Sequence, residues 1–241
     1  MTRFAKIAGA TLFVAAVLAA AMIWFRTYNM FQLNQAVVNG NQILSREQIL
    51  SLASLDYSQE IFYIDMNLIK SRICRHPLVR NASIHRFLPS GISIHVQERD
   101  LIAAITGENI QAVDVEGVVI PADNMLAMYD LPVITGVTTV RDTTHGFVAS
   151  EQMMTLINLL YAIREVDFEL YNELSEAHFS KDTGVVFYMR ATDLPVILGF
   201  DDYAHKALYF STMYHYLKNH GELASLKAID VRFSDQVVVK I

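Results

Sequence analysis

An uncharged apolar run near the N-terminus constrains this chain more than any other feature of the sequence. Residues 7–25 (IAGATLFVAAVLAAAMIWF) are 19 consecutive positions without a charged side chain. A helix of about this length spans the hydrocarbon core of a bilayer. We therefore predict a transmembrane helix over residues 7–25, preceded by a tail over residues 1–6 and followed by a linker over residues 26–31.

The charges that flank the run predict its orientation. Arg3 and Lys6 precede it, and Arg26 alone follows it. Because positive charge is retained on the cytoplasmic side, residues 1–6 should be a cytoplasmic tail and the rest of the chain should be extracytoplasmic. All 25 acidic residues follow Arg26, so the exported part is predicted to be acidic.

Two other interpretations of the run stay open. Ala19-Ala20-Ala21 has the small-x-small pattern of a signal-peptide cleavage site, although the apolar run continues for four residues beyond it. A buried core helix is the third interpretation, and the least favoured, since helices of soluble proteins are seldom apolar on every side over this length.

Charge and cysteine content exclude several classes of protein. The chain carries 19 basic and 25 acidic residues, a net charge of −6, so it has no basic excess for binding a phosphate backbone. We expect no nucleic-acid partner. Cys74 is the single cysteine, which excludes an internal disulfide framework and a cysteine-based zinc cluster.

Two helices are predicted between residues 45 and 74. Ser45 is a suitable N-cap, and Gln48 three residues later completes a capping box. Asp65 is a suitable cap for a second helix over residues 66–74. That helix must end before Pro77, whose ring disfavours helical backbone at the preceding residue.

Strands are predicted on either side of these helices. Residues 31–38 end at the turn signal Asn39-Gly40-Asn41, and residues 79–87 and 92–96 lie on either side of Leu88-Pro89-Ser90-Gly91. The last strand alternates apolar and polar side chains, which predicts one buried face: Ile92, Ile94 and Val96. Residues 32–99 thus follow the order strand, helix, helix, strand, strand.

This order resembles a POTRA domain, and the version that ends in Glu98-Arg99 resembles the one in the FtsQ/DivIB cell division proteins. The segments that carry the resemblance are Val38-Asn39-Gly40-Asn41, Ser45 to Ile49, Ile64-Asp65, His76-Pro77-Leu78-Val79 and Pro89 to Arg99.

Residues 100–241 extend the resemblance in the expected order. They predict a hairpin around Gly117, a Leu131 to Gly136 step, helices over residues 150–166 and 202–219, strands near 177–179, 185–189 and 196–198, and a terminal hairpin over 228–233 and 236–241. The resemblance implies an FtsQ-type β domain over residues 100–241. The predicted fold class is α+β: one transmembrane helix, a POTRA domain, and a mixed β-sheet with flanking helices.

No motif predicts catalysis or a cofactor. Asp182-Thr183-Gly184 is the tripeptide of aspartic proteases, but it occurs once, and that chemistry needs two such carboxylates. A hairpin turn is the better interpretation. No histidine pair has the spacing of a zinc site on a helix. We predict no enzyme, no metal, no cofactor and no small-molecule substrate, with an exported enzyme lacking a recognisable motif as one alternative.

The C-terminal strand is the first predicted binding surface. A strand that ends the chain is a candidate sheet edge, and an edge recruits a partner strand through main-chain hydrogen bonds. The resemblance implies that this hairpin docks the FtsB partner of an FtsB/FtsL-type coiled coil, through Arg232, Phe233, Ser234, Asp235, Gln236, Val237 and Val239. The alternative is a closing strand that binds no partner.

Two further features remain open at this stage. Asp230 and Arg232 should share one side of a strand, where they form an ion pair or meet an incoming charge. The strand over residues 79–87, with Asn81, Ile84 and Arg86, is the second predicted surface, because relatives recruit an upstream, FtsK-type protein there. Ordinary sheet packing is its alternative.

The predicted function is that of a noncatalytic scaffold at the division septum. It would sit in the bacterial inner (cytoplasmic) membrane with one span and link early and late cell division proteins. The other alternative is a POTRA-containing component of an envelope assembly or secretion system. Such a protein should continue into the short alternating strands of a barrel, against which the two predicted helices argue.

Overall fold

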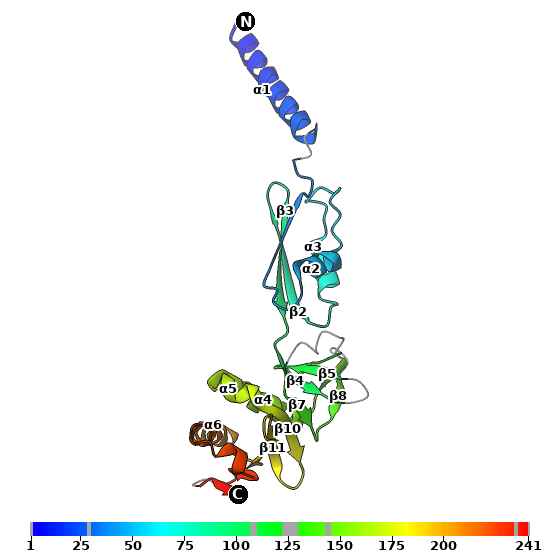
Figure 1. Ribbon diagram of the computed structural model, residues 1–241. Helices are drawn as coiled ribbons and strands as arrows, with labels where there is room; N and C mark the ends of the chain where they lie inside the picture. The colour runs from blue at the N-terminus through cyan, green and yellow to red at the C-terminus, as the bar shows by residue number, and fades with distance from the viewer. Residues whose placement is uncertain are drawn as a thin grey trace. The chain divides into compact units, whose positions relative to one another are not determined.

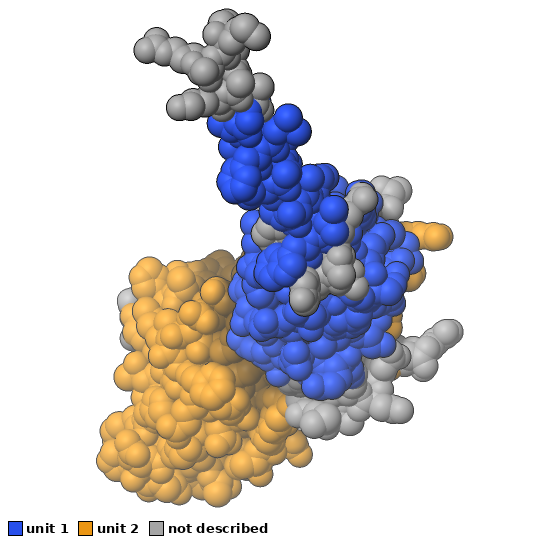
Figure 2. Space-filling model, turned by 90° about the horizontal axis from the view of Figure 1, so that it is seen from above, with its two compact units in different colours: residues 1–98 blue, residues 99–241 orange. Residues whose placement is uncertain are grey.

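The computed structural model describes residues 2–27, 30–106, 110–121, 130–142, 146–233 and 236–240. The chain divides into two compact units, residues 1–98 and residues 99–241, which Figure 2 shows in different colours.

The N-terminal helix α1 (Thr2–Thr27) contains the predicted apolar run. Its described large apolar side chains, such as Leu12 and Leu18, are exposed. Among the residues that the structure describes, no helix is both long enough and apolar enough for a membrane crossing. The structure therefore has a helix over the predicted run, longer than predicted at both ends, and its insertion in a membrane stays a prediction.

The rest of unit 1 is a three-stranded sheet with two helices. Strands β1 (Gln35–Asn39), β2 (Val79–Phe87) and β3 (Gly91–Glu98) lie in the order β1-β3-β2, with β1 parallel and β2 antiparallel to β3. Helices α2 (Arg46–Ala53) and α3 (Met66–Ile73) lie between β1 and β2 in sequence. The predicted order of strand, helix, helix, strand, strand is confirmed, and it is the order of a POTRA domain.

Both predicted helix caps are present. The Ser45 hydroxyl accepts a hydrogen bond from the Gln48 backbone N–H, and the Gln48 side chain accepts one from the Ser45 N–H. The Asp65 carboxylate accepts from the N–H groups of Asn67 and Leu68. These bonds satisfy donors that have no partner within the helix, so each helix begins where the sequence predicts.

The first strand is shorter than predicted. It begins at Gln35 rather than at Phe31, because the preceding residues pair with another segment. Gln32 forms an antiparallel bridge with Glu60, and the Ile61 N–H donates to the Phe31 carbonyl. A tertiary contact of this kind leaves no local pattern in the sequence.

Glu98 closes the other end of unit 1. Its carboxylate accepts hydrogen bonds from the backbone N–H groups of Gln42, Ile43 and Leu44, at 3.0, 2.7 and 2.9 Å. These three donors belong to the turn that links β1 to α2, which follows the end of the β1–β3 pairing. One ionised side chain therefore fixes this turn to the end of β3.

Unit 2 contains a nine-stranded mixed sheet. Its strand order is β14-β13-β12-β11-β10-β7-β4-β5-β6. The bounds of its strands are β4 Leu101–Ile105, β5 Gln111–Asp114, β6 Val119–Pro121, β7 Val133–Thr135, β10 Leu174–Ser180, β11 Gly184–Met189, β12 Pro195–Gly199, β13 Ala228–Asp230 and β14 Val238–Lys240.

Three helices cover one face of this sheet: α4 (Glu151–Val166), α5 (Phe168–Asn172) and α6 (Tyr203–His220) (Figure 1). The core contains buried residues of all three helices together with the alternate β11 residues Val185, Phe187 and Met189. Because alternate residues of a strand point to the same side, the helices share one face. The α+β fold with a mixed sheet is confirmed.

The hairpins predicted from glycine and turn residues are also present. Gly117 adopts φ +81° between β5 and β6, and the buried Asp114 carboxylate accepts the N–H groups of Glu116 and Val118. Asp182-Thr183-Gly184 forms the turn between β10 and β11, as predicted. The sequence did not predict α5 or the small hairpin of β8 (Thr139–Asp142) and β9 (Gly146–Ala149).

Replacing Glu98 by alanine should destabilise unit 1. Glu98→Ala removes the acceptor of three backbone N–H groups, two of them partly buried. Since hydrogen bonds to ionised groups are worth more than neutral ones, we expect a loss of about 2–3 kcal/mol in the free energy of unfolding. Urea unfolding of residues 27–241 measures this loss. Gln97→Ala, at the exposed neighbouring position, is the control and should change the free energy by less than about 0.5 kcal/mol.

Candidate interaction surfaces

The C-terminal strand lies at an edge of the large sheet. β14 pairs antiparallel with β13, with Ile229 opposite Val239 and Asp230 opposite Val238, and it is the last strand in the order. Within the described part of the chain, no strand pairs with its outer side. The strand therefore presents unpaired backbone groups, as an edge that recruits another strand must.

Asp230 and Arg232 form an ion pair beside this edge. The Arg232 Nε lies 2.9 Å from Asp230 Oδ1, and Nη2 lies 2.6 Å from Oδ2. The Asp230 residue is 4% exposed, whereas much of the Arg232 side chain is exposed. The first of the two interpretations of this pair, the structural one, therefore holds.

The ion pair shifts the pKa values of both partners. Hydrogen bonds from Arg232 hold the pKa of the Asp230 carboxyl below its ordinary value, although burial opposes this shift. Attraction to Arg232 and Lys240 adds to the lowering. The same hydrogen bonds raise the pKa of Arg232.

The other residues predicted for this surface differ in exposure. Phe233, Gln236 and Val239 are exposed, whereas Val237 is partly buried against the core. Ser234 and Asp235 lie outside the described residues. The described residues of the predicted set thus include both exposed and partly buried side chains.

A pocket lies where the chain leads into β14. It has a volume of about 310 Å³, and it is lined by Val237 and four α6 residues: Tyr209, Thr212, Met213 and Tyr216. The two tyrosines are about half exposed. Sequence reasoning missed them, although their spacing of seven residues places them on the same side of a helix.

The second predicted surface divides between two sides of its strand. β2 is an edge of the small sheet, and Asn81 is exposed there. Ile84 and Arg86 pair with Ile94 and Ile92, whose side chains are buried, so they lie on the side of β2 that faces the core. The Arg86 guanidinium donates to the carbonyls of Ile61 and Ile64, both at 2.6 Å. For Arg86, these contacts agree with the alternative interpretation, in which the residue packs within the domain rather than binding a partner.

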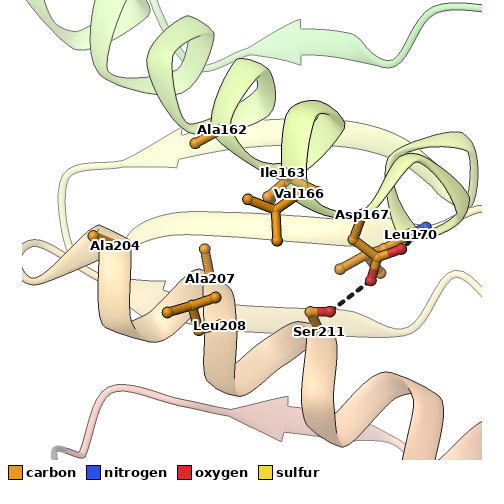
Figure 3. A pocket seen from close by; sticks show the side chains of 9 residues that line it. All are labelled: Ala162, Ile163, Val166, Asp167, Leu170, Ala204, Ala207, Leu208 and Ser211. Atoms are coloured by element: carbon orange, nitrogen blue, oxygen red, sulfur yellow. Dashed lines mark hydrogen bonds between the residues drawn. The ribbon is translucent and has the colours of Figure 1, made fainter.

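An apolar pocket of about 210 Å³ separates α4 and α5 from α6 (Figure 3). Its lining is mostly alanine and larger aliphatic side chains, with Asp167 and Ser211 at one end: Ala162, Ile163, Val166, Asp167, Leu170, Ala204, Ala207, Leu208 and Ser211. The small alanine side chains leave the space between the helices open.

Asp167 links the helices at the end of this pocket. It caps α5 through the Leu170 N–H, and it accepts from Ser211 Oγ at 2.5 Å and contacts His215 Nε2 at 2.8 Å. Burial alone would raise the pKa of Asp167, but these hydrogen bonds outweigh burial and lower it. The Asp167 carboxylate therefore stabilises the packing of α5 against α6 through these hydrogen bonds.

A hydroxyl, an acid and a histidine meet where β7 and β10 lie side by side in the large sheet. The Thr135 hydroxyl donates to Glu176 and lies 2.6 Å from His178 Nδ1. A nucleophilic triad needs the imidazole between the hydroxyl and the acid, with the acid bonded to it. Here the hydroxyl occupies the middle, and Nδ1 lies 3.7 Å from Glu176 Oε1, so the cluster has no proton relay. Among the described residues, no group of histidine, cysteine and acidic side chains has the arrangement of a metal site.

Comparison with known proteins matches both units. Residues 31–99 match the family model of the FtsQ-type POTRA domain, and residues 103–232 match that of the FtsQ/DivIB C-terminal region. The chain is 28% identical over 246 residues to "Cell division protein FtsQ" of Geotalea daltonii, which covers 100% of this chain and 88% of the relative. It is 25% identical to the FtsQ protein of Syntrophotalea carbinolica, over 88% of this chain and 74% of the relative.

A match to the "Cell division protein DivIB" of Clostridium acetobutylicum covers 45% of this chain and 44% of the relative at 32% identity. The C-terminal family match ends at residue 232. The candidate residues from Phe233 onward therefore lie beyond it.

Replacing Asp230 should make the stability of unit 2 less dependent on pH. The lowered pKa of Asp230 means that the carboxylate stabilises the fold above its unfolded pKa, and that this contribution is lost as pH falls through the lower folded pKa. We expect Asp230→Asn to cost about 2 kcal/mol at pH 7 and much less near pH 2. Urea unfolding at both pH values measures this. An equal cost at both would show that the ion pair does not carry the effect.

Proposed function

The chain belongs to the FtsQ/DivIB family of cell division proteins, and we propose that it acts as a noncatalytic scaffold that gathers early and late division proteins at the septum. The observation that carries this proposal is the position of β14 at an edge of the large sheet. There a partner can add a strand without displacing any strand of the described fold.

The proposed partner of this edge is an FtsB/FtsL-type coiled coil, whose chain would continue into a strand beside β14. Backbone hydrogen bonds would supply affinity but little selectivity, because every extended chain offers them. The neighbouring pocket supports selection by side chain. Its two half-exposed tyrosines and Val237 offer an apolar site within reach of a strand beside β14.

The proposed scaffold is held in the inner membrane by residues 7–25, with the N-terminus in the cytoplasm. Sequence supports this anchor through 19 uncharged positions and the excess of positive charge before them. A single anchor confines the two extracytoplasmic units to the membrane surface. That confinement raises their effective concentration toward partners anchored in the same membrane.

An upstream, FtsK-type partner is proposed for the edge strand of the POTRA sheet. Arg86 is occupied by the Ile61 and Ile64 carbonyls, and Ile84 faces the core side. A partner there would therefore use the backbone of β2 and exposed positions such as Asn81.

Two substitutions at the C-terminal edge should weaken capture of the coiled-coil partner. Phe233→Ala removes a half-exposed ring beside the edge, and we expect affinity to fall about tenfold or more, as for a hot-spot aromatic. Val237→Pro places a rigid ring at the pocket and should have at least this effect. Binding of a purified FtsB/FtsL-type complex to residues 27–241 is measured by titration calorimetry.

The control for this experiment is Phe147→Ala. Phe147 is 49% exposed and Phe233 is 46% exposed, but Phe147 lies on the β8–β9 hairpin. It should leave affinity unchanged, and circular dichroism should show all three variants folded. Unchanged binding by both edge variants would remove this surface from the proposal.

Charges within the apolar run should abolish membrane retention. The full chain should remain in membranes after alkaline carbonate washing, whereas Val14→Asp combined with Leu18→Asp should be released. Each aspartate at the centre of a spanning helix costs about 2.5–3.5 kcal/mol of insertion free energy. The control is Thr2→Asp, which lies outside the run and should leave the chain in the membrane. Release of the unmodified chain would refute the anchor.

A further inference from the structure

One end of the POTRA unit carries a group of exposed aromatic and aliphatic side chains, which we call the aromatic end. It comprises Tyr57, Phe62, Tyr63, Phe87 and Leu88. Tyr63 and Leu88 are the most exposed, at 75% and 67%. Exposed apolar side chains are ordinary when scattered, but a group of five on neighbouring segments indicates a surface that meets another phase or molecule.

Three segments far apart in sequence build this end. They are residues 30–34, the connection between α2 and α3 over residues 57–64, and the end of β2 with its turn over residues 86–90 (Figure 1). The first two are joined by the Gln32 and Glu60 bridge and by a hydrogen bond from the Gln32 side chain to the Tyr57 carbonyl. The rings of Phe31 and Phe62 lie 5.2 Å apart.

The third segment is fixed to the other two by polar contacts. Arg86 donates to the Ile61 and Ile64 carbonyls, on either side of Phe62 and Tyr63. The Ser90 hydroxyl donates to the Asn34 side chain at 2.9 Å. The exposed rings are therefore held on a braced surface rather than on a free loop. This also gives Arg86 a role that its exposed position on a strand did not predict.

We propose that the aromatic end rests in the headgroup interface of the membrane that anchors the chain. This inference rests on the proposed function, because it requires residues 7–25 to be in the bilayer. Only residues 26–30 separate that run from Phe31. The six steps from Phe25 to Phe31 span at most about 22 Å when fully extended, so covalent geometry alone keeps Phe31 close to the membrane surface.

The side chains suit that location. Tyrosine is enriched at the interface between bilayer and water, where its ring is buried and its hydroxyl stays hydrated. Asp56 and Glu60 are exposed near the same end, and the nearby Arg86 is engaged with carbonyls. Insertion therefore depends on apolar surface and not on attraction to anionic lipid, so added salt should not reverse it.

The test places a tryptophan at the aromatic end of the full chain. Trp24 is the single tryptophan, so Trp24→Phe gives a background without one. In it, Tyr63→Trp reports on the aromatic end, and Leu88→Trp is a second reporter. The control is Gln42→Trp, an exposed position in the turn that Glu98 holds at the opposite end of the strands. Each protein is reconstituted in vesicles of phosphatidylethanolamine and phosphatidylglycerol, with and without lipids brominated near the headgroup end of the acyl chain.

We expect brominated lipid to quench the fluorescence of Tyr63→Trp and Leu88→Trp about threefold more than that of Gln42→Trp, because only the first two positions would lie at the interface. The quenching should be equal in about 50 mM and about 500 mM salt, because it does not depend on electrostatic attraction. Equal, weak quenching at all three positions would overturn the proposal, and would leave the exposed rings to a protein partner.

Unmodified protein distinguishes this failure from failure of the anchor. Trp24 lies within the apolar run, so its fluorescence should be quenched whenever residues 7–25 are inserted. Quenching of Trp24 without quenching at position 63 would refute the aromatic end alone. Absence of quenching at Trp24 would refute the anchor and the aromatic end together.

Discussion

Three consecutive charged residues determine where each folded unit ends and begins. Glu98 accepts three backbone N–H groups in unit 1. Arg99 donates to the buried carboxylate of Asp114 at 2.7 Å, and Asp100 accepts from Arg164, both within unit 2. Each charge is bound inside its own unit. The rest of the structure depends on this arrangement, because β3 ends at Glu98 and β4 begins at Leu101, directly beside these fixed positions.

Both sheets leave edges that the described fold does not cover. A sheet with helices on one face buries that face, but its first and last strands still have backbone groups without partners. Enzymes of similar size gather acid, base and nucleophile in a cleft, whereas the polar clusters described here are bound into structure: Asp167 to Ser211 and His215, and Asp230 to Arg232. Among the described residues, backbone at the edges and the apolar side chains beside them are the surfaces on which the proposed scaffold role rests.

Local patterns in the sequence predicted local structure well. The caps at Ser45 and Asp65, the alternation of Ile92, Ile94 and Val96, and the turn at Gly117 all depend on neighbours within a few residues. Contacts between distant segments were not predictable in this way. The pairing of residues 31–33 with 59–61 shortened a predicted strand, and the bonds of Arg86 to two carbonyls turned a candidate binding residue into a brace. The five-residue helix α5 is too short to show a periodicity, and its tertiary contacts stabilise it.

Under the proposed function, selectivity at the C-terminal edge would come from apolar contacts rather than from charge. Asp230 is a buried acid beside the edge, and its carboxylate already accepts hydrogen bonds from the guanidinium and the backbone N–H of Arg232. A partner charge that bound Arg232 in place of Asp230 would leave the Asp230 carboxylate buried without its cation, which costs more than a surface ion pair returns. Val237 and the tyrosines of α6 impose no such cost, because a partner side chain that fills their pocket removes apolar surface from water. In the proposed complex, the same ion pair that stabilises β13 would therefore direct recognition toward the pocket and the backbone of β14.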